Sequence, residues 1–337
     1  MISSSLLIGT FLISWSLTFF VRRYALRNSL VDIPNARSSH FAPTPRGGGV
    51  SIVVSFLAAV WCGTLFGTVS WDLFLGLSGA GLLVALIGFI DDHGHIAARW
   101  RLLGHFAAAA WFLFCIGGLA PLSVFGFVIQ LGWWGSVLSA VYLVWFLNLY
   151  NFMDGIDGIA GAEAISACLA GALVYWLSGF AHELWGPLFL VGACAGFLVW
   201  NFPPAKIFMG DAGSGFLGVI LGGLSLQAAW LSPSFLWSWL ILLGVFIVDA
   251  TYTMLHRLIR GEKVYEAHRS HAYQYAARRY ASHKKVTIAI ILINFLWLTP
   301  LALLVGVGRL DGAAGLLIAY LPLVVLVVKH DAGKAES

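Results

Sequence analysis

The chain has 337 residues, of which 60% are hydrophobic and only 10% are charged, and its formal net charge is +4. Ordinary soluble domains carry roughly 25% charged residues, so this composition excludes a soluble globular protein. Apolar runs of roughly 18 residues or more recur along the chain and are continuous, whereas membrane barrels show alternating hydrophobicity. The sequence therefore predicts an all-α, polytopic membrane protein.

In chain order, the apolar runs predict about eleven transmembrane helices in a single integral membrane domain, residues 1–337. The first run lacks a basic N-terminal segment and a small-residue cleavage site, which favours a retained helix over a signal peptide. Residues 123–134 are apolar but too short to cross, so we expect an extended or interfacial element there. The predicted spans are 2–21, 48–69, 73–90, 102–120, 135–152, 158–179, 185–202, 212–231, 234–256, 286–306 and 312–329.

Lysine and arginine are distributed very unequally between the two sides of these spans. Arg309 lies alone on one side, and the other eighteen of the 19 basic residues lie on the opposite side. Because basic loops stay in the cytoplasm, we expect the N-terminus outside and the C-terminus in the cytoplasm. The predicted cytoplasmic loops are about 22–47, 91–101, 153–157, 203–211 and 257–285, and they contain Asp91, Asp92, Asp154, Asp157 and Asp211.

Two adjacent aspartates, Asp91 and Asp92, close the third predicted span. Carboxylates are more stable at helix N-termini than at C-termini, where the helix dipole is negative. The pair therefore indicates a neighbouring cation or a functional role. We interpret both as catalytic candidates. Arg99 and Arg101 follow in the same loop and are candidates for neutralising an anionic ligand, or for marking the cytoplasmic interface; we select Arg99 for substrate binding.

Asn148, Asn151, Asp154 and Asp157 are spaced three residues apart at the end of the fifth span. On a helix this spacing places side chains on one face, so their oxygens would line one stripe. The alternative interpretation is a capped helix–turn–helix, with Asp157 capping the sixth span. We select Asp154 as a catalytic and metal-binding candidate, Asn151 as a metal and substrate ligand, and Asp157 as a substrate contact.

A glycine-rich loop ending in Asp211 leads into the eighth span. Backbone N–H groups at a helix N-terminus favour anions, so this turn is suited to a phosphate while Asp211 holds a metal on it. Lys206, in the same loop, is a candidate substrate contact. Arg46, before three glycines at the start of the second span, is another candidate substrate contact. The alternative interpretation is that the glycines only permit close helix packing.

The connection between the ninth and tenth spans contains His268, Arg269 and His271. Histidines three residues apart beside an arginine are suited to phosphate oxygens or a nucleobase. The alternative is an ordinary basic loop attracted to anionic lipid. Two further acids, Glu163 and Asp249, lie inside apolar spans and are candidates for supporting roles.

Carboxylates, cations and glycine turns on one face of a helical bundle fit phosphoryl transfer with Mg²⁺, with Mn²⁺ as a candidate substitute. The four cysteines lie in apolar runs without C-x-x-C spacing and predict packing roles rather than zinc binding. A site at the membrane edge would admit one substrate from water and one from the lipid phase.

Six motifs, in this order, resemble the polyprenyl-phosphate N-acetylhexosamine-1-phosphate transferases, the MraY/WecA superfamily, over nearly the whole chain. The histidine stretch is most similar to the O-antigen-initiating, WbpL-type branch. The motifs are Val31–His40 (VDIPNARSSH), Pro45–Gly49 (PRGGG), Phe89–Asp92 (FIDD), Asn148–Gly158 (NLYNFMDGIDG), Met209–Ser214 (MGDAGS) and His268–His271 (HRSH).

The resemblance implies a bacterial inner-membrane enzyme that transfers a sugar 1-phosphate from a UDP-N-acetylhexosamine to undecaprenyl phosphate and releases UMP. It implies Asp92 as base or lipid-phosphate positioner, Asn151 and Asp154 in the nucleotide and metal region, and Asp211 as main Mg²⁺ ligand. Direct attack and a covalent aspartyl intermediate both stay open. Membrane lipids and a homodimer are candidate partners, and no nucleic acid is expected.

Two other classes of function compete with this interpretation. A proton- or metal-coupled transporter would also place acids within membrane helices, although such sites usually lie near the midplane rather than at one face. A catalytically inactive scaffold is the third possibility, which the full set of aspartates disfavours.

Overall fold

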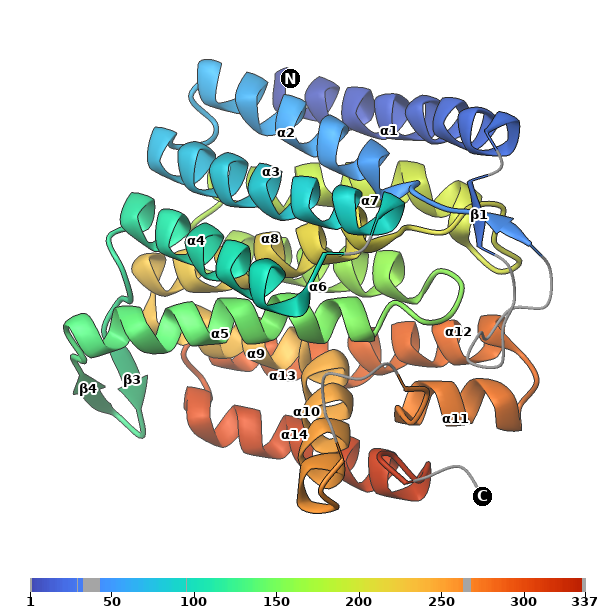
Figure 1. Cartoon of the computed structure of the whole chain (residues 1–337). Coiled ribbons are helices and arrows are strands. Elements are labelled where there is room, and N and C mark those ends of the chain that lie inside the picture. Colours follow the sequence, from blue (N-terminus) through green and yellow to red (C-terminus); the bar gives the residue numbers. More distant parts are fainter. Residues whose placement is uncertain (1, 29, 33–42, 95, 263–267, 335–337) are drawn as a thin grey trace.

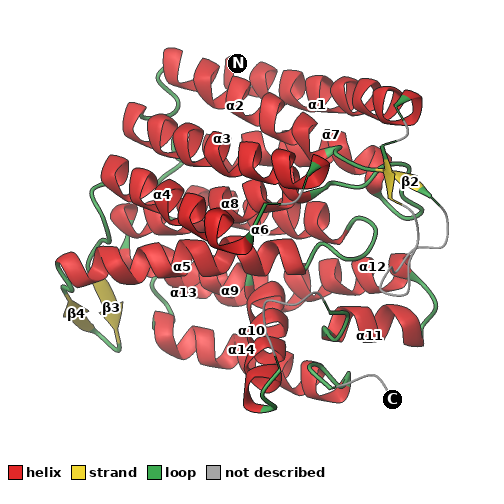
Figure 2. Ribbon diagram, viewed as in Figure 1, coloured by secondary structure: helices red, strands yellow, loops and turns green. Residues whose placement is uncertain are grey.

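The computed structural model describes all residues except 1, 29, 33–42, 95, 263–267 and 335–337, and these residues are mostly helical (Figures 1 and 2). This confirms the all-α prediction. The helices are α1 (Ile2–Arg27), α2 (Gly49–Leu65), α3 (Trp71–His93), α4 (Ala98–Ile116), α5 (Trp133–Phe152), α6 (Ile159–Leu177), α7 (Trp185–Asn201), α8 (Asp211–Leu231), α9 (Pro233–Leu242), α10 (Gly244–Ile259), α11 (Ala272–Arg279), α12 (His283–Ile293), the π-helical turn η1 (Asn294–Leu298), α13 (Thr299–Gly306) and α14 (Gly312–Lys329).

A helix lies at every predicted span, but not all of these helices have the length and composition of a membrane span. Among the described residues, seven helices are long and apolar enough to cross a membrane, and the pair α9–α10 makes an eighth if it counts as one span. The apolar helices α2 and α7 have 17 residues each. The multi-pass membrane character is thus clear, whereas the number eleven and the orientation stay predictions.

The ninth predicted span, 234–256, is not one straight helix as expected. The chain bends by 71° between α9 and α10, and α10 runs across the direction of the neighbouring helices in Figure 1. The polar residues Asp249 and Arg257 are buried on α10. In this position Asp249 accepts hydrogen bonds from the start of α11, and Arg257 pairs with Glu262 of the following loop, which satisfies polar groups that are costly to bury in an apolar span.

Helix α8 is the central element of the bundle, packed against α3, α5, α2 and α9. Its first turn meets the start of α2 at a backbone contact, where a Cβ added to Gly49 would lie 2.3 Å from the Cα of Gly213. Glycines at these positions are therefore required for close helix approach, which was the alternative interpretation of the Gly47–Gly49 run.

The two ends of the bundle differ (Figure 1). The antiparallel hairpin β3 (Leu122–Val124) and β4 (Phe127–Ile129) lies at one end and confirms the extended element expected in residues 123–134. The short pair β1 (Val31–Asp32) and β2 (Thr44–Pro45) lies at the opposite end, as do the end of α3, the loop after α5, and α11. The motif-bearing segments therefore gather at one end.

Candidate active site

Asp92 joins the end of α3 to the start of α8. Its Oδ1 accepts a hydrogen bond from the backbone N–H of Asp211 at 3.2 Å, and its Oδ2 accepts from Ala212 at 3.3 Å. Gly210 has a φ of +80°, and a Cβ there would lie 2.8 Å from Oδ2. A carboxylate at a helix N-terminus is favourable, so Asp92 caps α8 and fixes the position of Asp211 beside it.

Two arginines contact the end of α3, one at the Asp91 carboxylate and one at the backbone carbonyl of Asp92. The Asp91 carboxylate forms an ion pair with Arg101 and accepts a hydrogen bond from the N–H of Ile96 at 2.9 Å. Arg46 donates to the backbone carbonyl of Asp92. These contacts supply the positive charge that two acids at a helix C-terminus require.

The helix α5 ends at Phe152, the end of the predicted span 135–152, so the helical stripe includes Asn148 and Asn151 but does not continue to Asp157. Asp154 and Asp157 lie in the loop that leads to α6, where Gly158 has a φ of +75°. Asn148 donates to the carbonyl of Val144 within its own helix at 2.7 Å. The glycines allow the chain to leave the helix, and this turn overrides the three-residue spacing.

Asn151 and Asp154 both face the start of α8. The Asn151 side-chain oxygen accepts from the Ser214 hydroxyl at 3.0 Å. Burial raises the pKa of Asp154 well above its ordinary value, and the nearby carboxylates of Asp211, Asp157 and Asp92 raise it further. No hydrogen bond to the Asp154 carboxylate occurs among the described residues. A carboxyl group crowded by other carboxyl groups is stabilised in its ionised form by a bound cation.

Asp157 is held by structural contacts. Its Oδ2 accepts from the N–H of Ala205 at 2.9 Å, and its Oδ1 lies 3.2 Å from Nδ1 of His283. Its carbonyl accepts from the Thr287 hydroxyl at 2.9 Å. Gly158, not Asp157, occupies the cap position of α6, so the alternative interpretation of Asp157 as a helix cap is wrong. Asp157 instead connects its loop to the loop before α8 and to α12.

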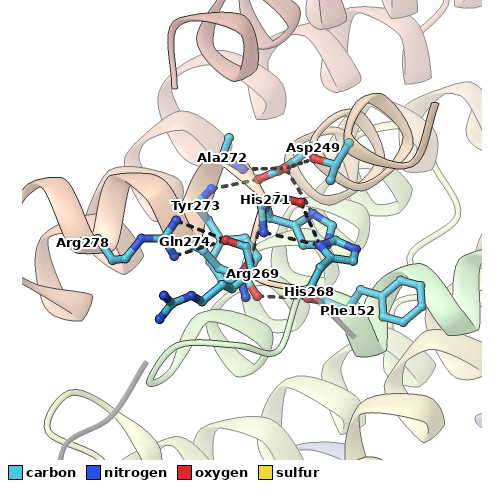
Figure 3. Close-up of polar contacts among 11 residues, drawn as sticks. Phe152, Asp249, His268, Arg269, His271, Ala272, Tyr273, Gln274 and Arg278 are labelled. Atoms are coloured by element: carbon cyan, nitrogen blue, oxygen red, sulfur yellow. Dashed lines mark hydrogen bonds and ion pairs between the residues drawn. The ribbon is translucent and has the colours of Figure 1, made fainter. Parts of the chain in front are cut away.

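A second cluster surrounds the start of α11 and is built on Asp249 (Figure 3). The carboxylate of Asp249 accepts from the N–H groups of Ala272 and Tyr273, each at 3.0 Å, and lies 3.3 Å from Nδ1 of His271. His271 is only 2% exposed, and its Nε2 has no hydrogen-bond partner among the described residues. Asp249 therefore fixes both the helix and the imidazole.

His268 lies between this histidine cluster and the end of α5. Its ring centroid is 4.9 Å from that of His271 and 6.3 Å from that of Phe152. Burial, with His271 and Arg257 nearby, lowers the pKa of His268 to about 3, so the ring is neutral at physiological pH. The Tyr273 hydroxyl donates to the Phe152 carbonyl at 3.0 Å and so connects the cluster to the loop of Asp154.

Three selected residues make other contacts. Arg99 lies over the ring of Trp100 at 5.5 Å, and Lys206 lies over the ring of Trp200 at 5.7 Å. In the described part of the chain, no hydrogen bond or ion pair joins either one to an aspartate. Arg269 accepts two hydrogen bonds from Arg278 through its backbone carbonyl. Its place near the site is therefore set by α11.

The residues around Asp211 and Asp154 offer oxygen ligands for a metal ion. Within the described ranges, no three side chains of His, Cys, Asp or Glu lie close enough together to hold one. Mg²⁺ commonly takes only one or two carboxylates and completes its shell with substrate phosphates and water. The carboxylates of Asp211 and Asp154 and the amide oxygen of Asn151 fit such an ion, and the crowding around Asp154 supports this.

Four residues that complete the site were not among the selected site residues: Arg101, Ser214, Asp249 and Tyr273. Arg101 and Asp249 were weaker candidates, because Arg101 follows the aspartate pair and Asp249 is an acid inside an apolar span. Ser214 belongs to the Met209–Ser214 motif but had no assigned role, and Tyr273 gave no signal, since only the fold brings it to Phe152. Residues 33–40 of the first motif lie outside the described residues.

The chain is similar in sequence to known proteins of one family. Residues 74–229 match the model of glycosyl transferase family 4. The chain is 28% identical to a probable undecaprenyl-phosphate N-acetylglucosaminyl 1-phosphate transferase of Bacillus subtilis, covering 83% of this chain and 79% of the relative. It is 29% identical to a decaprenyl-phosphate N-acetylglucosaminephosphotransferase of Mycolicibacterium smegmatis (86% and 78%). It is 31% identical to a phospho-N-acetylmuramoyl-pentapeptide-transferase of Streptococcus pneumoniae (66% and 71%).

Proposed function

The chain belongs to glycosyl transferase family 4, the MraY/WecA-like enzymes, and from this premise we propose that it transfers an N-acetylhexosamine 1-phosphate from a UDP-sugar to undecaprenyl phosphate. UMP is the second product. The reaction would initiate a lipid-linked glycan, with O-antigen or a related envelope polysaccharide as the end product. The names of the Bacillus and Mycolicibacterium relatives, both polyprenyl-phosphate N-acetylglucosamine phosphate transferases, support the sugar class.

One observation carries the proposal: aspartates from three distant segments meet at one end of a membrane helix bundle. Asp92 contacts the backbone of Asp211 directly, and the charges of Asp92 and Asp211 act on Asp154. Phosphoryl transfer needs little covalent chemistry from the protein and depends on positioning and electrostatic stabilisation. A dense carboxylate cluster beside arginines fits that requirement.

In the proposed reaction, an oxygen of the lipid phosphate forms a bond to the β-phosphorus of the UDP-sugar. The bond from that phosphorus to the bridging oxygen breaks, and UMP leaves with the electron pair. Mg²⁺ held by Asp211, Asp154 and Asn151 would neutralise charge on the pyrophosphate, and Mn²⁺ is a candidate substitute. Asp92 keeps Asp211 in place through the first turn of α8.

The histidine cluster is positioned to contact the donor. His268 is neutral and half-buried, and it lies next to Phe152 at the end of α5. His271 has its Nδ1 turned to Asp249, and its buried Nε2 makes no hydrogen bond within the described residues. With Arg269 between them, these side chains are suited to the phosphates and uracil of a UDP-sugar. We place the active site on the cytoplasmic side of the bacterial inner membrane, where such donors occur.

The test is UMP release by purified protein in detergent or nanodiscs. We expect release from a UDP-N-acetylhexosamine only when undecaprenyl phosphate and Mg²⁺ are both present, with a lipid-linked pyrophosphoryl sugar as co-product. A panel of donors would identify the sugar. Folded protein that releases no UMP, but moves protons or metal ions across vesicles, would instead favour a transporter.

Asp211→Asn is the sharpest variant for the metal assignment. In the described structure the Asp211 side chain makes no hydrogen bond or ion pair, while its backbone N–H donates to Asp92. The variant should therefore keep the fold and lose turnover by roughly 100-fold or more. Near-normal activity of a folded Asp211→Asn protein would remove Asp211 from the site.

A further inference from the structure

His105 is a buried polar side chain that the proposed function has not used. It lies in the second turn of α4 and is only 7% exposed. Its Nδ1 is buried without a hydrogen-bond partner among the described residues. A buried polar atom without a partner is unfavourable, so this nitrogen is a candidate contact for a water, an ion or a ligand.

The ring borders a small cavity within the aspartate cluster. This cavity of about 20 Å³ is lined by the polar side chains of Asp91, Arg101, His105, Asn151 and Asp211 and by apolar residues of α3, α5 and α8. A volume of this size holds one water-sized group and excludes a whole phosphate. One phosphate oxygen, with the rest of the group outside, would fill it.

The wall of this cavity on α4 carries the hydrogen-bond donors. Arg101 and His105 are four residues apart, so they lie on one face of α4, about 6 Å along its axis. Arg101 is already paired with Asp91, and it keeps further N–H groups for a second acceptor. An oxygen between this wall and Asp211 would meet cationic and neutral donors on one side and the metal-binding carboxylate on the other.

The position of α4 indicates from which phase this oxygen comes. The residues next to Arg101 and His105 on the outer face of α4 are exposed apolar side chains: Trp100, Leu102, Leu103 and Phe106. In a membrane protein such a face contacts lipid. The His105 wall is therefore adjacent to the bilayer, whereas His268 of the histidine cluster lies next to Phe152 at the end of α5.

From these contacts we infer that His105 is a binding residue for the lipid acceptor: it donates a hydrogen bond to an oxygen of the polyprenyl phosphate, together with Arg101. The inference rests on the proposed function and assigns its acceptor phosphate to the α4 side of the aspartate cluster. The chain of the acceptor would then remain in the bilayer along α4.

The test compares His105→Leu, which removes the ring nitrogens, with His105→Gln, which keeps an N–H donor. A hydrogen bond to a charged phosphate is strong, so we expect His105→Leu to raise the KM for undecaprenyl phosphate by about tenfold or more. The KM for the UDP-sugar should change less than about twofold, and His105→Gln should recover most of the loss. His182→Leu, at a histidine whose side chain is 76% exposed and far from the aspartate cluster, is the matched control.

Direct binding gives a second readout that does not need turnover. Thermal stabilisation by a short-chain polyprenyl phosphate, without Mg²⁺ or donor, should be weaker for His105→Leu than for wild type. Unchanged acceptor KM and unchanged stabilisation in folded His105→Leu would overturn the inference. The inference would also be overturned if His105→Leu and His105→Gln lost activity equally and changed the KM values of undecaprenyl phosphate and the UDP-sugar together. If wild-type protein releases no UMP with any donor, the proposed function fails instead.

Discussion

At the residue scale, Asp92 serves the fold and the site with the same two oxygens. Both oxygens accept backbone hydrogen bonds at the start of α8. Loss of a helix cap costs about 1–2 kcal/mol, so Asp92→Ala should lower the free energy of unfolding by that amount. Asp92→Asn keeps an accepting oxygen and should lose less.

Thermal unfolding of detergent-solubilised protein measures this difference. Asp211→Asn is a suitable comparison, because the Asp211 side chain makes no hydrogen bond in the described structure and its loss should cost little stability. If Asp92→Ala unfolds at the wild-type temperature, the capping role is wrong.

His268 gives a prediction on pH. Its pKa of about 3 in the folded protein lies below the ordinary value of 6.5. Between these two values the unfolded chain binds the proton and the folded chain does not, so stability rises with pH in this window and is lost as pH falls below about 6.5. One group contributes at most about 1.4 kcal/mol per pH unit.

We therefore expect His268→Gln to flatten the dependence of the unfolding temperature on pH between about 4.5 and 6.5. His182→Gln is the control, because the His182 side chain is 76% exposed at the opposite end of α6. An unchanged pH dependence in His268→Gln would show that its ring is not held neutral.

Individual residues were predictable where their chemistry conflicts with an apolar chain. Asp91, Asp92, Asp154 and Asp211 were selected for that reason, and the fold brings them together. The partners of Asp157 were not predictable, because Ala205 and His283 are distant in sequence and make the contacts through backbone and ring nitrogens. Arg99 was preferred over Arg101, yet the direction of each side chain depends on the start of α4, which the sequence leaves uncertain by several residues.

At the scale of elements, the contact between α2 and α8 depends on glycine. A methyl group on Gly49 would lie 2.3 Å from Gly213, and backbone atoms cannot move aside as a flexible side chain can. We expect Gly49→Ala to destabilise the protein by about 1–3 kcal/mol and to reduce turnover by displacing Asp211.

Gly9→Ala is the matched control, since a Cβ at Gly9 meets no atom within 4 Å. It should leave stability and activity unchanged or slightly raise stability. Unfolding temperature and UMP release, measured for both variants, decide the matter. Equal behaviour of the two variants would contradict the proposed backbone contact.

Helix positions followed from hydropathy, because a run of apolar residues long enough to span a bilayer has few alternatives. The break between α9 and α10 did not follow. Pro233 begins α9, and the bend lies ten residues later, at Leu243. The bent arrangement brings Asp249 into tertiary contact with the start of α11, and an apolar run carries no information about such contacts.

At the scale of the whole molecule, the predicted orientation is open to a direct test. The unequal loops place the segment around His182 outside and the C-terminal segment around Lys334 in the cytoplasm. In intact cells, a membrane-impermeant thiol reagent should label His182→Cys and leave Lys334→Cys unlabelled until the cells are opened. The parent protein, with its four free cysteines, is the background control. The reverse labelling pattern would invert the topology and place the aspartates outside.

The capping contact of Asp92 affects what sequence variation can reveal about this protein. A library of variants selected only for folding and membrane insertion should still retain an acid or amide at position 92, because α8 needs its cap. The same library should accept many residues at position 211. If an acid at position 211 is retained only under selection for growth, its retention indicates a role in the reaction. Retention at position 92 would indicate a role in the fold as well.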